Sequence, residues 1–383
     1  MNQKRFLELV HLSSVSTLSP VRQSALWRIL NRDGPAAMQR AILKSGLIRG
    51  AVREQLIQAD RLDRARAKLK DCAELGICAI PRGDPAYPEL LMECSDAPVV
   101  LYLRSRPEML ESNLKTLNSG RWLSVVGARK ATPHGLAAVR QLLQGLCAVP
   151  ALSFASGLAF GVDAALHEHC LNLGLHTAAV LAHGLEEANP AGNRALAHRI
   201  LDQGGCWLSE FPPGQKAFPG LFPRRNRIMA GMGLGTVLVE AEKRSGSLIT
   251  AKLADSYDRQ VWAMPGAWDA PMSSGCNHLI RTHIAAILEE PAQILEDLGF
   301  DGAVETQPPL CLPEGELGSM LKAASTMDTF QQEDLQQWAT ANRIAAGQLA
   351  AILGEAELEG WIIREQDGQY RLSDKLRYAR EPD

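Results

Sequence analysis

The sequence lacks the features that would direct a protein out of the cytosol. Its eight cysteines form no CxxC pair and no zinc-ligand spacing, which is typical of reduced cysteines in a cytosolic chain. The first residues are polar and show no signal-peptide pattern. Residues 141–162 carry no charge, but glycines and Pro150 interrupt them, so we expect no membrane span. We therefore expect a cytoplasmic protein without membrane contact.

An excess of charge of one sign is also missing. The chain holds 40 basic and 43 acidic residues, a net charge of −3, which excludes a polycationic coat but not a local basic groove. Hydrophobic residues make up 46% of the chain and charged residues 22%, which is typical of a globular protein. With 383 residues we expect two or three domains.

The chain changes character along its length in a way that predicts four parts. Residues 1–105 are mainly helical in spacing and end in a β-like lead-in. Residues 106–300 alternate short apolar strands with helices, and 301–315 contain three prolines and predict a linker. Residues 316–383 have helices followed by a two-stranded hairpin, the pattern of a winged helix-turn-helix and its tail.

The middle part predicts an α/β fold with a doubly wound parallel sheet. Helices lie between its short apolar segments, and in such sheets ligands bind beyond the carboxyl ends of the strands. The loops that directly follow the strands are therefore the candidate site. The strands are expected at 123–126, 151–155, 177–182, 206–208, 236–239 and 261–264.

Two of these loops combine glycines with a helix start. The first has Arg129 and Lys130 beside a Thr132–Pro133 helix start, which predicts anion binding or a solvated turn. The second predicts either a backbone nest for phosphate or close helix–strand packing, and both remain open. The candidate binding residues are Gly127, Ala128, Arg129, Lys130 and Thr132 in the first loop and Ser156, Gly157, Ala159 and Gly161 in the second.

Two further segments bring more cations. One is the densest basic cluster of the middle part and includes a ring that can stack on a base. The other follows a strand, and its serines predict a capped helix with free N–H groups. Four such loops in one chain favour a composite anion-binding edge. The candidates are Phe222, Arg224, Arg225, Asn226 and Arg227, then Lys243, Arg244, Ser245, Gly246, Ser247, Thr250 and Lys252.

Signals for catalysis are weak. His167-Glu168-His169 is not HExxH, and its two histidines point apart on a helix. The sequence has no GxSxG elbow. We expect no catalytic residue, no metal and no cofactor.

In order along the chain, these motifs resemble those of the bacterial DNA-processing protein A (DprA/Smf) family, from about Gly83 to Ile287. The resemblance rests on a lead-in, an arginine loop, a glycine loop and several later signatures. They are Gly83-Asp84, Tyr87-Pro88, Ala97–Tyr102, Val126–Arg129, Ser156–Asp163, Ser209–Gly214, Phe222–Ile228, Ser245–Ala251, Met264-Pro265-Gly266 and Gly275–Ile280.

The resemblance implies an extended Rossmann-like domain that binds and protects single-stranded DNA (ssDNA) and helps load the RecA recombinase, in natural transformation or DNA recombination, without catalysis. It also implies a homodimer through that domain, a sterile-alpha-motif-like N-terminal part and a C-terminal winged helix. A flexible strand that follows one cationic edge need not be read for its sequence.

The chain departs from the family pattern at three places. Asn189-Pro190, followed by Asn193, stands where the family has Tyr-Pro, and His283-Ile284 replaces Gly-Ala. The winged-helix part holds 12 acidic and 7 basic residues, and its expected recognition helix, 346–358, has no Lys or Arg. Phosphate contact needs cations, so this part is expected to contact protein and not DNA.

An enzyme is the alternative. Gly233-Leu234-Gly235-Thr236 followed by Glu240 is similar to the signature of nucleoside-monophosphate phosphoribohydrolases, with the spacing off by one residue. Because 236–240 is strand-like, Glu240 is expected at a strand end and not as a catalytic carboxylate.

Overall fold

A computed structural model describes residues 2–44, 48–119, 121–149, 151–300, 315–324, 330–358, 360–364 and 369–372. The chain divides into two compact units. They are Met1–Gln144 with Val149–Gly299, and Gly145–Ala148 with Phe300–Asp383.

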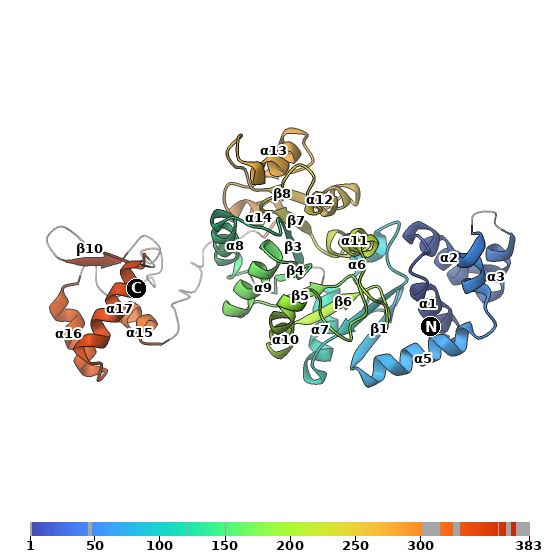
Figure 1. Ribbon diagram of the computed structural model, residues 1–383, viewed down its shortest axis with the longest axis horizontal. Coiled ribbons are helices and arrows are strands. Elements are labelled where there is room, and N and C mark those ends of the chain that lie inside the picture. The colour runs from blue at the N-terminus through green and yellow to red at the C-terminus, as the bar shows by residue number, and fades with distance from the viewer. Residues whose placement is uncertain are drawn as a thin grey trace. The chain divides into compact units, whose positions relative to one another are not determined.

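A nine-stranded sheet forms the centre of the first unit (Figure 1). The strand order is β1-β2-β6-β5-β4-β3-β7-β8-β9, and the seven strands from β6 to β9 run parallel. This confirms the expected α/β fold with a doubly wound parallel sheet. The strands are β1 (Ile77–Pro81), β2 (Val100–Arg104), β3 (Trp122–Val126), β4 (Ser153–Ser156), β5 (Thr177–Val180), β6 (Cys206–Ser209), β7 (Gly235–Leu238), β8 (Gln260–Ala263) and β9 (Ala286–Ile287).

Two strands extend the sheet beyond the predicted parallel part. β1 pairs antiparallel with β2, and β2 pairs antiparallel with β6. Both come from the segment assigned to the lead-in before residue 105, where turn residues and a β-like run already indicated strand. The boundaries at residues 105 and 300 stay predictions.

The sheet is buried on both faces, which explains its nearly continuous apolar strands. Side chains alternate along a strand, so Val100 and Tyr102 of β2 join one core while Leu101 and Leu103 join the other. The first core includes the N-terminal helices, α9 and α10, and the second includes α6, α11 and α12.

One helix of the α/β part begins at the proline where the sequence predicts a helix start. The predicted helix from Pro133 matches α8, whose first turn has Pro133 at its start. Its helices are α6 (Glu89–Glu93), α7 (Leu110–Asn118), α8 (Pro133–Leu146), α9 (Val162–Asn172), α10 (Arg194–Asp202), α11 (Phe222–Met232), α12 (Ser247–Ser256), α13 (Ser274–Arg281) and α14 (Ala292–Asp297), with 3-10 turns at Pro107–Met109, Ala191–Asn193, Pro219–Leu221 and Pro271–Ser273.

Five helices precede the sheet, and the first and fifth of them contact its strands. This agrees with the mainly helical spacing expected there, and the last two helices are separated at residues 58–60. Ser13 and Tyr102 hydroxyls hydrogen-bond at 2.8 Å, which ties the first helix to β2. The five are α1 (Gln3–Ser14), α2 (Pro20–Asp33), α3 (Pro35–Lys44), α4 (Gly50–Ile57) and α5 (Arg61–Glu74).

The second unit contains three helices and a hairpin among its described residues, in the order that a winged helix requires. Phe330 stacks on Tyr370 with ring centroids 5.9 Å apart, inside a core that includes Met320, Leu353 and Ile362. The predicted linker, 301–315, lies outside the described residues except for Gly315. The elements are α15 (Glu316–Ala324), α16 (Gln332–Ala341), α17 (Ala346–Leu358), β10 (Ile362–Arg364) and β11 (Tyr370–Leu372).

Candidate nucleic-acid interface

The candidate site lies where the strand order of the sheet reverses. The chain proceeds from β3 through β4 and β5 to β6 on one side, and returns to β7, β8 and β9 on the other. The connections that leave the carboxyl ends of β3 and β7 therefore diverge and open a crevice between them. A cleft of about 460 Å³ occupies this position.

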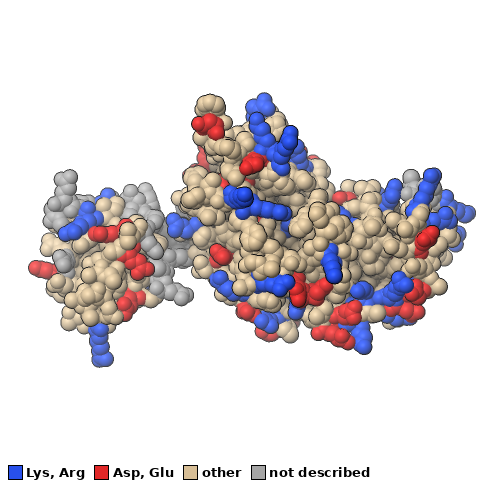
Figure 2. Space-filling model, viewed as in Figure 1, with Lys and Arg blue, Asp and Glu red and all other residues tan. Residues whose placement is uncertain are grey.

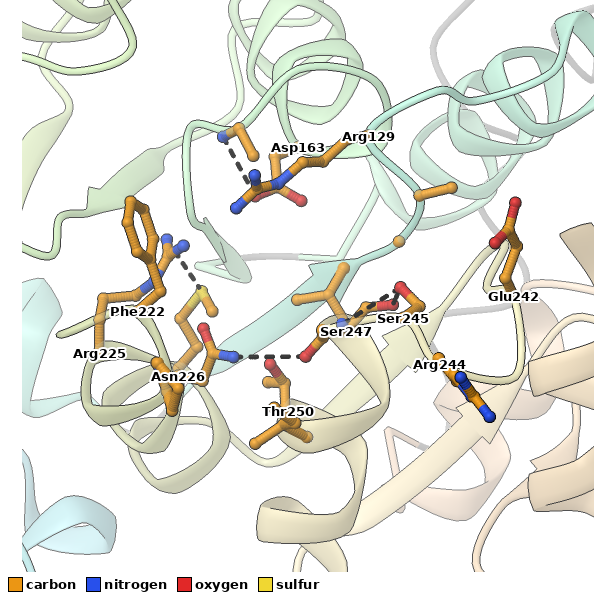
Figure 3. A pocket seen from close by; sticks show the side chains of 18 of the residues that line it. Arg129, Asp163, Phe222, Arg225, Asn226, Glu242, Arg244, Ser245, Ser247 and Thr250 are labelled. Carbon is orange, nitrogen blue, oxygen red and sulfur yellow. Dashed lines mark hydrogen bonds between the residues drawn. The ribbon is translucent and has the colours of Figure 1, made fainter. Parts of the chain in front are cut away.

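Residues from the four predicted segments line the cleft together with Met272 (Figure 3). The structure thus brings together loops that the sequence could only place at strand ends. Arg129, Arg225 and Ser247, which come from three of the predicted loops, all line it. The predicted residues that line it are Gly127, Ala128, Arg129, Lys130, Ala159, Phe222, Arg225, Asn226, Arg244, Ser245, Gly246, Ser247 and Thr250.

Arg129 and Phe222 form one pair on the cleft wall. The Arg129 guanidinium lies 5.6 Å from the centroid of the Phe222 ring, a distance at which a cation and a ring face attract each other. Arg129 and Lys130 are exposed, whereas Phe222 is half-buried. An exposed cation beside a ring can meet a phosphate and a base of the same nucleotide.

Arg225 contributes a buried charge at the inner end of the cleft. Its Nη1 donates to the Val180 carbonyl oxygen at 2.7 Å, and only 5% of the residue is exposed. Burial lowers the pKa of Arg225 to about 10; Asp163 opposes this shift and the charge of Arg129 adds to it. Arg225 is thus still a cation at neutral pH. A bound phosphate would offset its repulsion with Arg129.

The glycine loop does not present a free phosphate nest. Its Gly157 and Ala159 N–H groups donate to Asp163 Oδ2 at 3.1 and 3.2 Å. Asp163 lies in the first turn of α9, so the chain's own carboxylate occupies the nest. Burial raises the pKa of Asp163, although Arg225 and these N–H groups oppose the shift. The loop therefore follows the packing alternative.

The two glycines of that loop allow this close packing. A Cβ on Gly157 would lie 1.8 Å from Arg225 Nη1, and one on Gly161 would lie 2.2 Å from the Ala128 carbonyl oxygen. Gly161 also has φ 76°, a conformation that favours glycine. Both glycines therefore leave room for residues of the cleft wall, Arg225 and Ala128, to pack closely.

The start of α12 forms the opposite wall. Ser245 and Ser247 hydroxyls hydrogen-bond at 2.7 Å, and the Ser247 N–H reaches the Ser245 hydroxyl only at 3.4 Å. Gly246 is the N-cap residue and supplies no side-chain cap, so the predicted serine cap is weak. The positive end of the helix faces the cleft here. Arg244 and Glu242 also line this wall, the latter as an opposing charge.

Thr132 caps α8 and binds Glu240. Its hydroxyl accepts from the Gly135 N–H at 3.1 Å, its N–H donates to Glu240 Oε2 at 2.9 Å, and its hydroxyl donates to Glu240 Oε1 at 2.5 Å. Glu240, the carboxylate of the phosphoribohydrolase alternative, is thereby hydrogen-bonded to the loop that carries Arg129. This arrangement favours a structural task for Glu240.

Eight of the predicted residues do not line the cleft. Ser156 donates to the Val125 carbonyl oxygen at 2.7 Å. Arg224 and Arg227 both turn to buried Glu210, with N–O distances of 2.7 and 2.5 Å. Burial raises the pKa of Glu210, but the two arginines bring it below its ordinary value. The eight are Thr132, Ser156, Gly157, Gly161, Arg224, Arg227, Lys243 and Lys252.

Several residues that shape the cleft were not among the predicted ones. Asp163 and Glu240 each bond two groups of a cleft loop, and a carboxylate next to a helix start is the sequence signal that could have identified Asp163. Asn193, at a departure from the family pattern, is buried and donates to the Leu158 carbonyl oxygen at 2.9 Å. Phe160, beside the cleft residue Ala159, is 50% exposed.

Neither a membrane helix nor a metal cluster is found in the part of the chain that the structure describes. None of its helices combines the length and apolar character needed to cross a bilayer. No three histidine, cysteine or acidic side chains come together there as a possible metal site.

Comparison with known proteins assigns the family. Residues 79–299 match the family model of DNA recombination-mediator protein A. Protein Smf of Escherichia coli is 35% identical over 76% of this chain and 77% of its own length. Protein Smf of Synechocystis is 40% identical over 56% of this chain, and the match spans about half (52%) of that relative.

Solved structures agree on the fold. DNA processing protein A (DprA) from Streptococcus pneumoniae matches with a TM-score of 0.65 and 31% identity, covering 78% of this chain and 98% of that one. DNA processing protein A from Helicobacter pylori, whose single-stranded DNA binding mode is known, matches in fold with a TM-score of 0.51 and 23% identity, covering 59% and 96%. The motifs, the cleft at the strand reversal and these matches lead to one conclusion: the chain belongs to the DprA/Smf family of DNA recombination mediators.

Proposed function

We propose that the cleft between the β3 and β7 loops binds single-stranded DNA without regard to its sequence. The observation that carries this proposal is that Arg129, Arg225 and the start of α12 all line the same cleft. Phosphates meet cations and helix N–H groups there, and Phe222 offers a face for a base. The protein from Helicobacter pylori with this fold binds single-stranded DNA, which supports the proposal.

Fluorescence anisotropy with a labelled dT20 strand and a matched duplex, over a series of salt concentrations, tests the proposal. We expect dT20 to bind more tightly than the duplex, and log K to fall linearly with log salt. Arg129→Ala and Arg244→Ala should each weaken dT20 binding by roughly five- to tenfold. Arg225→Ala is a poor probe, since it removes a buried group that bonds the Val180 carbonyl.

The matched control is Arg66→Ala, which removes an exposed arginine paired with Asp63 on α5. It should leave the affinity for dT20 unchanged within twofold. Equal affinities of the Arg129→Ala variant and the parent for dT20 would remove the cleft from consideration.

We further propose that the protein delivers its DNA to the RecA recombinase and forms a homodimer through its Rossmann-like domain. Membership of the mediator family supports both proposals. One chain has a mass of 41.6 kDa, and light scattering should give twice that mass. Adding the protein should shorten the lag of RecA filament growth on strands covered by single-strand-binding protein; an unchanged lag would count against delivery.

We also propose that the protein is not an enzyme and that its second unit contacts protein and not DNA. The bonding of Glu240 to Thr132 supports the first proposal, and the acidic recognition helix supports the second. Free base should not be released from nucleoside monophosphates; Glu240-dependent release would favour the phosphoribohydrolase alternative.

A further inference from the structure

The N-terminal helices carry a concentration of positive charge that the net charge of the chain conceals. Residues 1–75 hold 14 Lys or Arg against 7 Asp or Glu, although the whole chain holds 40 against 43. Between residues 15 and 57, only Asp33 and Glu54 are acidic, while seven residues are basic. Figure 2 shows Lys and Arg atoms crowded over the end of the first unit where α2 and α3 lie in Figure 1.

The cations on α2 share one side of that helix. Helical periodicity places Arg22, Arg28 and Arg32 within about a third of a turn of each other, and all three are exposed. Arg40 and Lys44 lie one turn apart on α3 and are exposed as well. We call Arg22, Arg28, Arg40 and Lys44 the α2–α3 basic face.

The charges of the α2–α3 basic face are not neutralised by the protein. None of the four residues forms an ion pair or a hydrogen bond within the described part of the chain, whereas Arg32 pairs with Asp33 at 3.0 Å. Unpaired like charges on two neighbouring helices repel each other. Such a surface attracts a polyanion, and ordinary solubility does not require it.

The chemistry of this face fits phosphate groups and not bases. Its exposed large apolar side chains are Val21 and Leu43, at 69% and 46%, and neither is aromatic. Trp27 of α2 is half-buried, and the Arg82 guanidinium covers its ring at 4.2 Å. The face therefore offers charge without a stacking platform, in contrast to the cleft with Phe222.

Buried and partly buried hydrogen bonds connect α2 and the segment before it to the rest of the first unit. Arg224 of α11 donates to the Ser16 and Leu18 carbonyl oxygens just before α2, while its neighbour Arg225 lines the cleft. On the other side of α2, Arg82 Nη1 donates to the Ser24 hydroxyl at 2.9 Å, and that hydroxyl donates to the Ser95 carbonyl oxygen at 2.7 Å. α11 thus contacts both the cleft and the segment that leads into α2.

From this arrangement we propose that the α2–α3 basic face is a second nucleic-acid-binding surface, which holds the phosphate backbone of DNA that continues beyond the cleft. The proposal rests on the proposed function of the cleft, because it concerns the same DNA molecule. The occupant is the continuing single strand, because the proposed function places that strand in the cleft.

The test compares three labelled probes: dT10, dT50, and a hairpin duplex with a dT10 tail. The full-length variant is Arg22→Gln, Arg28→Gln, Arg40→Gln, Lys44→Gln. It should bind dT10 within twofold of the parent, and should bind dT50 at least tenfold more weakly. For dT50, the slope of log K against log salt should be smaller in magnitude by about 3 than for the parent, as expected for four lost phosphate contacts.

The matched control removes the same number of charges elsewhere. Arg64→Gln, Arg66→Gln, Lys70→Gln and Lys115→Gln each lose an exposed cation that pairs with a neighbouring carboxylate. This variant should bind all three probes like the parent. Thermal unfolding of both variants should match the parent, because every substituted side chain is exposed.

Each outcome is decisive for the second surface. Loss of dT50 binding supports the proposal, whereas loss confined to the hairpin overturns it in favour of a flanking duplex. Unchanged binding of both long probes, as expected if an acidic protein occupies the face, overturns the proposal, and so does an equal loss in the control variant. Failure of the cleft itself is distinguishable, because Arg129→Ala would then leave the affinity for dT10 unaltered.

Discussion

Single carboxylates in this protein hold cleft loops in place, and Glu240 is the clearest case. Both of its oxygens accept from Thr132, and a Cβ on Gly135 would lie 2.4 Å from its carboxyl carbon. Gly135 is therefore needed for the carboxylate to reach the loop. Glu240 thereby holds the loop that carries Arg129 and Lys130.

Removing that carboxylate should weaken DNA binding without any direct contact to DNA. Glu240→Ala should reduce dT20 affinity roughly tenfold, since hydrogen bonds to a charged group contribute about 1.5–3 kcal/mol. Glu240→Gln keeps the shape and an acceptor for Thr132, so its affinity should stay within about threefold of the parent. Anisotropy of both variants makes the measurement.

A double-mutant cycle supplies the control for this prediction. Thr132→Val removes the hydroxyl partner of Glu240, and its effect should not add to that of Glu240→Ala. Additive losses would mean that Glu240 acts on DNA by another route.

His283 occupies a backbone position that favours glycine. It follows α13 with φ 59°, and the N–H groups of His283 and Ile284 donate to the Ile280 and Leu279 carbonyl oxygens. These two bonds make the Schellman ending of a helix, in which glycine is preferred. The departure from the family's Gly-Ala therefore preserves the turn but places a side chain in the left-handed region.

Restoring glycine there should stabilise the protein. His283→Gly should raise the free energy of unfolding by about 0.5–1 kcal/mol, because a non-glycine residue in this conformation costs roughly 1 kcal/mol. Urea denaturation measures it. The same substitution inside the helix, His278→Gly, should lower stability; a loss of stability at both sites would contradict the explanation.

At the scale of elements, the strand pattern was the most predictable part. Short apolar runs between helices predicted β3 to β8 within a few residues, because a strand buried on both faces must be apolar along its length. The two-residue β9 was not predicted, since so short a strand leaves no periodic signal.

The basic cluster on α11 shows where sequence reasoning about the site fell short. Successive helical residues turn by about 100°, so Arg224, Arg225 and Arg227 cannot all face one cleft. Arg224 and Arg227 turn inward to Glu210, which directly follows β6 and lies 14 residues before Arg224. That ion-pair cluster depends on tertiary contacts, which the spacing of the arginines does not reveal.

Because the cleft is complete within the first unit, the C-terminal unit should be dispensable for DNA binding. All residues that line the cleft lie between Val126 and Met272, and the expected recognition helix α17 has Glu355 and Glu357 but no cation. A chain ending at residue 314 should bind dT20 within twofold of the full chain. A loss of fivefold or more would show that the acidic unit contributes to the interface.

At the scale of the whole molecule, buried histidines from separate elements make the fold sensitive to acid. Burial lowers the pKa of His167 on α9 to about 3 and of His176 before β5 to about 4. His176 Nε2 lies 2.7 Å from Asn113 Oδ1, and its Nδ1 lies 3.1 Å from the Ser153 hydroxyl, contacts that a neutral ring satisfies. Burial also lowers the pKa of His11, His169 and His183.

The sign of the effect follows from where the protons bind. Below pH about 6.5 the unfolded chain protonates these histidines while the folded chain keeps them neutral, so the unfolded state binds more protons. Stability should therefore fall as the pH drops from about 6.5 toward 4, by up to about 1.4 kcal/mol per pH unit for each histidine. Asp163 acts in the opposite direction, because burial raises its pKa.

Substituting one histidine separates its share from the rest. His167→Gln should reduce the slope of unfolding free energy against pH by about 1.4 kcal/mol per unit between pH 5 and 6, whatever its effect on stability at pH 7.5. His198→Gln changes an exposed histidine of α10 and should leave the slope as it is in the parent. Urea denaturation at pH 5, 5.5, 6 and 7.5 gives these slopes. If His167→Gln kept the parent's slope, the proton difference between the folded and unfolded states would have to come from other groups, with His167 already protonated in the fold or shielded in the unfolded chain.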